Sequence, residues 1–238
     1  MTEFSLDFIS ALNHWQKGWC EVQETKARLA DDLERECAKI DGKYKIVNQP
    51  CYRKRYLHRG ELIDVLYNGN KDEGITSWTT DYKYAEIFKG IYRDDAVTAA
   101  IFEYTPTPTE VILNINKLWE CEDFKNQINT LSVEKPELCD AILNFQSNQS
   151  EVILKTPLRG NDIIALSGKS SDFDDLCDAA NIPMEQRPAF FHQLCKDGYA
   201  IEMPTLIDRD ATKNAIKNTL IKFNQLLTAV RNGSYRPA

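Results

Sequence analysis

The chain lacks the features that mark most secreted, membrane and zinc-binding proteins. Its seven cysteines are widely spaced with no Cys-x-x-Cys pair, which favours free thiols in a reducing compartment over disulfides or a zinc site. No apolar run is long enough to span a bilayer, and no signal peptide precedes the first helix. Gly-x-Gly-x-x-Gly and Walker A sequences are absent, which disfavours the commonest nucleotide-binding folds. We therefore expect a cytoplasmic protein without a metal and without membrane contact.

Positive charge is also scarce. The 29 Lys and Arg residues are outnumbered by 36 Asp and Glu, and the net charge of −7 disfavours a broad electrostatic contact with nucleic acid. One segment, 43–59, is basic and contains no acid. Its basic residues are Lys43, Lys45, Arg53, Lys54, Arg55 and Arg59. The favoured interpretation is a solvated basic strip, and the alternative is a landing surface for a polyanion.

The residues that are present predict a folded α+β protein. Hydrophobic residues make up 42% of the 238 positions, enough for a full core, and ten Phe and ten Tyr argue against disorder. Three regions are expected: an N-terminal helical arm over 1–42, a strand-rich core over 43–168 and a C-terminal helical region over 169–238. Ser167–Ser171 is the best linker by composition.

Hydrophobic periodicity predicts the individual elements. Helices are expected over 5–39, 61–67, 82–88, 121–132, 136–145, 173–180, 185–196 and 210–231. Strands are expected over 43–47, 52–58, 75–79, 96–104, 110–115, 151–154, 163–166 and 199–203. Gly18 could kink the first helix, whose Trp15 and Trp19 are assigned to core packing. Tyr84, Ala85 and Phe88 should point inward. The apolar stripe of the last helix could pack on the core or dock a partner.

Three short motifs carry the polar residues of a candidate site. They are Tyr56–Gly60, Thr76–Thr80 and Asn148–Leu154. Alternation along a strand places Gln149 and Glu151 on the same face. Burying a carboxylate and an amide on one face of a strand costs free energy, so we expect these two groups to serve a function.

In this order, the motifs resemble the Arg/Ser-Thr/Glu class of ADP-ribosyltransferases, NAD-consuming enzymes of which many are bacterial toxins. The resemblance covers about residues 50–166 and excludes the first forty and the last seventy. It implies a core of two packed, mostly antiparallel small sheets that form an NAD cleft, flanked by helices. The partners implied are NAD, a macromolecular acceptor and an antitoxin or inhibitor protein.

The resemblance also implies roles for the charged residues. Arg59 would pair with the pyrophosphate of NAD, and Gly60 would let the backbone approach the nicotinamide amide. Glu151 would stabilise the positively charged sugar left when nicotinamide departs. Gln149 would orient the incoming nucleophile. Since the family usually has glutamate at this last position when arginine is the acceptor, Gln149 suggests another side chain or a nucleobase nitrogen.

The remaining roles fall to hydroxyls and aromatic rings. Ser77 would hold the carboxylate of Glu151 in one orientation, and Thr79 would contact the nicotinamide ribose. The rings that could stack on nicotinamide or on the target are Trp78, Tyr82 and Phe145. Two other functions stay open: NAD hydrolysis, with water as the acceptor, and a partner-binding module without catalysis, in which Arg59 is an ordinary ion-paired residue and Glu151 a solubilising strand charge.

Overall fold

The computed structural model describes residues 3–18, 23–88, 96–146, 150–167, 177, 180–197 and 206–233. It is an α+β structure with mostly antiparallel strands, as predicted. The chain forms two compact units. The first combines 1–53, 72–88 and 103–158, and the second combines 54–71, 89–102 and 159–238. Strands β1 (Cys51–His58) and β4 (Ala96–Tyr104) contribute residues to both units.

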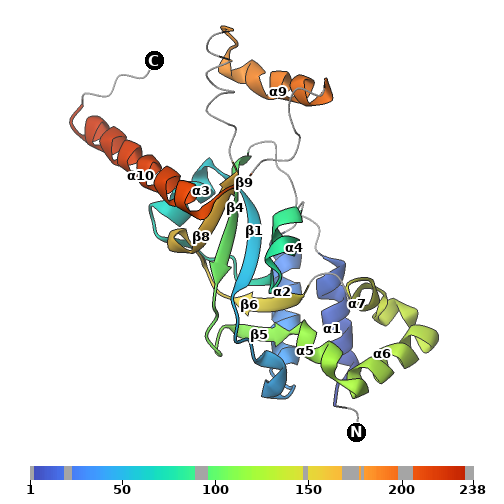
Figure 1. Ribbon diagram of the computed structural model, residues 1–238. Helices are drawn as coiled ribbons and strands as arrows, with labels where there is room; N and C mark the ends of the chain where they lie inside the picture. The colour runs from blue at the N-terminus through green and yellow to red at the C-terminus, as the bar shows by residue number, and fades with distance from the viewer. Residues whose placement is uncertain are drawn as a thin grey trace. The chain divides into compact units, whose positions relative to one another are not determined.

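The first unit begins with two helices in place of the single helix predicted over 5–39. They are α1 (Leu6–Lys17) and α2 (Gln23–Cys37), which lie side by side (Figure 1). Gly18 ends α1 with a φ of 82°, a conformation that glycine adopts without a steric penalty, and its N–H bonds to the carbonyl of Trp15. The break that was expected as a kink is therefore a helix end.

Three short strands form the sheet of this unit together with β1. They are β3 (Ile75–Thr79), β5 (Val111–Asn114) and β6 (Glu151–Lys155), and the order is β5-β6-β3-β1. Every pair is antiparallel, with Thr79 opposite Glu151 and Tyr52 opposite Thr79. The core of the unit fills the space between these strands and the helices. Its members include Phe4, Phe8, Leu12, Leu33, Ile75, Leu113, Phe124, Ile128, Ile142 and Ile153.

The other helices of the first unit are short. They are the 3-10 helices η1 (Gly42–Lys45) and η2 (Pro136–Leu138) and the α-helices α4 (Tyr82–Ile87), α5 (Ile115–Glu120), α6 (Glu122–Glu134) and α7 (Asp140–Asn144). The strand predicted over 43–47 was wrong, because Asp41 accepts a hydrogen bond from the Lys43 N–H and starts η1. The helix predicted over 136–145 is split into η2 and α7. Phe88, expected to point inward, is 43% exposed.

The second unit contains α3 (Arg59–Leu66), β2 (Asn70–Lys71), β8 (Ile163–Ser167), β9 (Leu206–Ile207), α9 (Arg187–Lys196) and α10 (Arg209–Arg231). Its strand order is β1-β4-β8-β9. The strands β4 and β8 are antiparallel, as are β8 and β9. The smaller elements are β7 (Leu158–Arg159), η3 (Gly160–Asp162) and η4 (Met184–Gln186).

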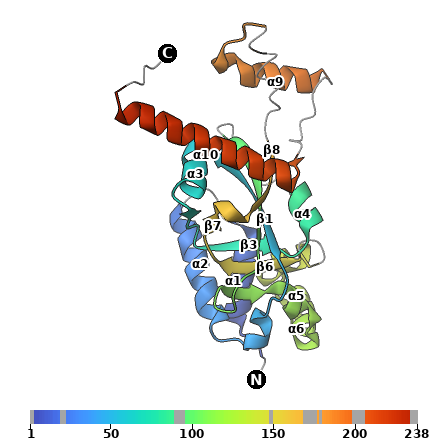
Figure 2. The same cartoon turned by 60° about the vertical axis from the view of Figure 1, so that its left-hand side comes forward.

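Helix α10 is the longest described element, and Figure 2 shows it as one uninterrupted helix. The N–H of Leu166 in β8 donates to the hydroxyl of Thr212, which ties the first turn of α10 to that strand. Its predicted apolar stripe is half-buried over Ile216–Leu227, and Val230 is 53% exposed. Among the described residues no helix is both long and apolar enough to cross a bilayer.

The predicted linker Ser167–Ser171 begins too early, because Ser167 is a buried residue of β8 whose hydroxyl accepts a hydrogen bond from the Ala99 N–H. Residues 168–171 lie outside the described part of the chain. So does the strand predicted over 199–203, and so does most of the helix predicted over 173–180.

Glu110 ties the segment after β4 to the sheet and makes the stability of the first unit depend on pH. Its carboxylate accepts hydrogen bonds from Tyr104, Thr107 and Thr156. Burial would raise the pKa of Glu110, but these donors outweigh it and lower the pKa from 4.5 to about 2. Since the folded pKa is the lower one, this stabilisation is present above pH 4.5 and is lost as the pH falls towards 2.

We therefore expect Glu110→Gln to lower the free energy of unfolding by about 2 kcal/mol at pH 7 and by progressively less as the pH falls through that window. Urea unfolding from pH 7 to pH 2.5 measures the difference. Glu134→Gln, at an exposed position of α6, is the control. A difference that stays constant with pH would contradict this role.

Candidate functional site

The two motif strands β3 and β6 bring Ser77 and Glu151 together. Thr79 lies directly opposite Glu151 in the antiparallel register, and Ser77 is two positions from Thr79 on the same face. The hydroxyl of Ser77 donates to Glu151 Oε1 across 2.5 Å. The pairing of the Ser-x-Thr strand with the Gln-x-Glu strand thus supplies a donor that holds the carboxylate.

Helix α1 adds two further donors. Trp15 Nε1 donates to Ser77 Oγ across 3.1 Å, and Gln16 Nε2 donates to Glu151 Oε2 across 3.0 Å. An indole N–H can only donate, so Ser77 accepts from Trp15 and its own proton must point to Glu151. Each oxygen of the Glu151 carboxylate therefore has a donor. In each of these three hydrogen bonds the donor and the acceptor are assigned.

The surroundings of the Glu151 carboxylate are almost dry. The residue is 6% exposed, and this burial raises its pKa, while the neighbouring donor groups of Ser77, Gln16 and Trp15 work against the rise. Burial also raises the pKa of Tyr84, with a smaller contribution from the charge of Glu151. In such a low-dielectric place a fixed carboxylate interacts strongly with any positive charge that develops beside it.

The backbone just before Glu151 is bent. Ser150 has a φ of 44°, which is uncommon for a residue with a side chain, and its carbonyl accepts a hydrogen bond from the Thr80 N–H across 3.0 Å. This bond continues the β3–β6 pairing beyond Glu151. Gln149, predicted to orient the nucleophile, lies outside the described residues.

Two other predicted site residues, Thr79 of β3 and Tyr82 of α4, both contact neighbouring groups of the protein. Thr79 is buried on the face of Glu151, and its hydroxyl accepts a hydrogen bond from the Asp81 N–H. Tyr82 is half-buried and makes an edge-to-face ring contact with Tyr52.

Trp78 points to the opposite face of the strand from Thr79. There it is 3% exposed and donates to Thr76. In this structure Trp78 packs in the core, and its stacking role on a ligand stays a prediction.

Arg59 and Gly60 belong to the second unit, where they are the first two residues of α3. The helix begins two residues earlier than predicted because His58 caps it. The ring of His58 accepts from the Glu61 N–H, and the Glu61 carboxylate accepts from the His58 N–H. Gly60 is exposed, and a Cβ there would meet the His58 ring at 3.2 Å. The convergence of Arg59 with Glu151 stays a prediction.

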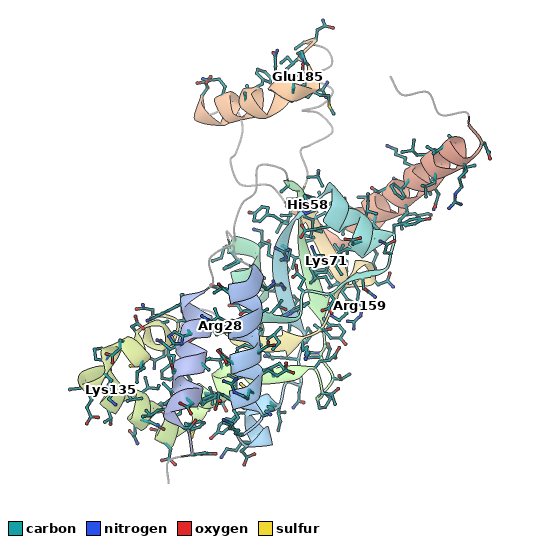
Figure 3. All side chains as sticks on the ribbon, turned by 180° about the vertical axis from the view of Figure 1, so that it is seen from behind. Arg28, His58, Lys71, Lys135, Arg159 and Glu185 are labelled. Atoms are coloured by element: carbon teal, nitrogen blue, oxygen red, sulfur yellow. The ribbon has the colours of Figure 1, made fainter. Side chains whose placement is uncertain are left out.

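Three of the six basic residues of the segment 43–59 pair with carboxylates. Lys43 pairs with Glu3, and Arg53 with Glu73. The buried carboxylate of Glu61 pairs with both Arg55 and Lys71. Figure 3 labels Lys71 and His58, which both belong to the second unit. These ion pairs favour a structural role for the strip over a landing surface for a polyanion.

Sequence reasoning missed Gln16 and gave Trp15 a packing role alone. A signal was present, since Gln16 lies four residues after Leu12 and eight after Phe8 and so faces the core with them. A polar residue on that apolar stripe needs a polar partner.

No protein-family model, curated protein or solved structure matches this chain.

Proposed function

We propose that the protein is a mono-ADP-ribosyltransferase that cleaves NAD between nicotinamide and ribose and transfers ADP-ribose to a macromolecule. The observation that carries this proposal is the hydrogen bond from Ser77 to Glu151 between β3 and β6. The resemblance implies that Ser77 holds the carboxylate of Glu151 in one orientation, and this hydrogen bond supports that role. The proposal includes an NAD cleft formed by two packed sheets, with Arg59 and Gly60 at the pyrophosphate and the nicotinamide.

The chemistry follows from the position of the Glu151 carboxylate. The bond between the ribose C1′ and the nicotinamide nitrogen breaks, and its electron pair leaves with nicotinamide. The positive charge that develops on the sugar is stabilised by Glu151, through a hydrogen bond from the ribose 2′-hydroxyl. A nucleophile of the acceptor then adds to C1′ and loses its proton, with Gln149 as the orienting residue.

The proposed acceptor is a protein or a nucleic acid, either in the cell that makes the enzyme or in a cell to which the enzyme is delivered. A toxin of a toxin–antitoxin system and a phage protein that modifies its host both fit this profile, and the toxin would have an antitoxin or inhibitor as a further partner. The half-buried stripe of α10 is a surface on which such a protein could dock.

The test is incubation of cell lysate with the purified protein and NAD labelled in its adenylate phosphate. We expect label in macromolecules that either protease or nuclease removes, together with release of nicotinamide. The Glu151→Gln protein serves as the control for background labelling.

Two other outcomes would point to the alternative functions. Nicotinamide release without a labelled macromolecule would identify water as the acceptor and the protein as an NAD glycohydrolase. If the wild-type protein releases no nicotinamide under any condition, the enzymatic proposal is wrong and a binding module is the better explanation.

A further inference from the structure

The side chain of Gln16 carries an unused acceptor next to the Glu151 carboxylate. Gln16 is 9% exposed, and its Nε2 donates to Glu151 Oε2. Its Oε1 is buried and accepts no hydrogen bond from any residue in the described part of the chain. A buried carbonyl oxygen without a donor is unfavourable, so its presence beside a candidate site calls for an explanation.

The orientation of this amide is set by the carboxylate. If the amide were rotated by 180°, Oε1 would face the ionised Glu151, and two acceptors would be in contact. With Glu151 ionised, Nε2 therefore stays on the carboxylate and the buried Oε1 points away from it.

The other partners of Glu151 leave this acceptor free for a ligand. Ser77 is occupied between Trp15 and Glu151, so its only proton is already used. Glu151 itself retains acceptor capacity, because a carboxylate accepts up to about four hydrogen bonds and receives one at each oxygen here. Gln16 Oε1 and Glu151 thus present two neighbouring acceptors, separated by one amide group.

The ligand chemistry that matches two neighbouring acceptors is two neighbouring donors, as in the vicinal hydroxyls of a ribose. We propose that α1 completes the site, with Gln16 Oε1 accepting the 3′-hydroxyl of the nicotinamide ribose while Glu151 accepts the 2′-hydroxyl. This assignment rests on the proposed function and extends it to a residue outside the three motifs. Trp15 acts through Ser77 and is a positioning residue.

The test combines Gln16→Met with an NAD analogue that lacks the 3′-hydroxyl of the nicotinamide ribose. Methionine has a similar length and neither donates nor accepts as an amide does. We expect Gln16→Met to lower kcat/KM for nicotinamide release from NAD by about 10- to 100-fold. For the wild-type protein, kcat/KM should be about tenfold lower with the analogue than with NAD. For Gln16→Met, kcat/KM should be the same with both substrates, because the partner of the 3′-hydroxyl is already missing.

His14→Gln, on the exposed side of the same helix, is the matched control and should behave as wild type with both substrates. A thermal unfolding curve for each variant shows whether α1 stays folded. Gln16→Asn provides a second variant that keeps the amide on a shorter side chain, and partial recovery relative to methionine is expected.

The outcomes separate this inference from the proposed function. If wild type releases nicotinamide and Gln16→Met retains full kcat/KM, the role of Gln16 is wrong while the enzyme assignment stands. Independent, multiplicative losses from the substitution and from the missing hydroxyl would also overturn it. If wild type does not act on NAD at all, the proposed function itself fails.

Discussion

Glu151→Gln is expected to lower the rate of nicotinamide release by about 100- to 1,000-fold, since it removes the fixed charge that stabilises the sugar cation. The neutral amide has nearly the same shape, and Ser77 can still donate to its oxygen. The new Nε2 would face Nε2 of Gln16, but rotation of the Gln16 amide turns its unused Oε1 towards the new donor. The folded structure should therefore tolerate the change.

The same variant is expected to be more stable than wild type at neutral pH. Burial raises the pKa of Glu151 above its ordinary 4.5, so the ionised form is disfavoured in the folded protein relative to the unfolded chain. At pH values between the ordinary and the raised pKa, the folded state binds more protons than the unfolded chain. The free energy of unfolding of wild type therefore falls as the pH rises through that window. Glutamine does not titrate and avoids this loss.

Nicotinamide release and thermal unfolding from pH 4 to pH 8 measure both effects. The gain in melting temperature should be largest at the alkaline end and disappear below about pH 4.5. Glu134→Gln, at an exposed glutamate of α6, should change neither quantity. Full activity in Glu151→Gln would be incompatible with the proposed role of the carboxylate.

Asn13→Ala is expected to destabilise the protein by about 3 kcal/mol, which corresponds to a drop in melting temperature of about 6–12 °C. Asn13 is 1% exposed and makes hydrogen bonds from both ends of its amide. Its Oδ1 accepts from the N–H groups of Ala141 and Ile142, while Nδ2 donates to the Glu137 carbonyl and to Asp140. Alanine leaves the two N–H groups at the start of α7 buried without an acceptor.

Thermal and urea unfolding test this anchor between α1 and α7. Asn144→Ala, an exposed position on α7, is the matched control and should shift the midpoint little. Asn13→Asp keeps the acceptor for the two N–H groups but places a carboxylate oxygen against Asp140 and the Glu137 carbonyl, so little of the lost stability should return at neutral pH. Equal stability of Asn13→Ala and wild type would show that α7 finds other partners when α1 cannot cap it.

The strands of the site were predictable because their patterns are local. Residues 75–79 and 151–154 alternate or run apolar between clear turn residues, and the two strands pair as β3 and β6. The last helix was equally clear over 210–231, where one stripe repeats at helical spacing. The contact between Ser77 and Glu151 follows from the motifs together with antiparallel pairing.

The features that the sequence did not predict have local causes in some places and distant contacts in others. Residues 43–47 have the composition of a strand, yet the side chain of Asp41 bonds to the next turn and starts a 3-10 helix. Gln16 and Glu151 are 135 positions apart, and no local pattern relates a polar residue on a helix stripe to one carboxylate among many. Trp78 sits within the Ser-x-Thr motif, but the two-residue alternation of β3 sends its ring to the other face.

The distance between Gln16 and Glu151 along the chain also has a consequence for the order of synthesis. Helix α1 is synthesised long before the strand that carries its carboxylate partner, which lies 135 positions later in the chain. Until β6 is made, Trp15 of α1 can bond to Ser77 of β3, but Gln16 lacks its carboxylate partner. The contact between α1 and the Glu151 carboxylate therefore forms only late in each round of elongation.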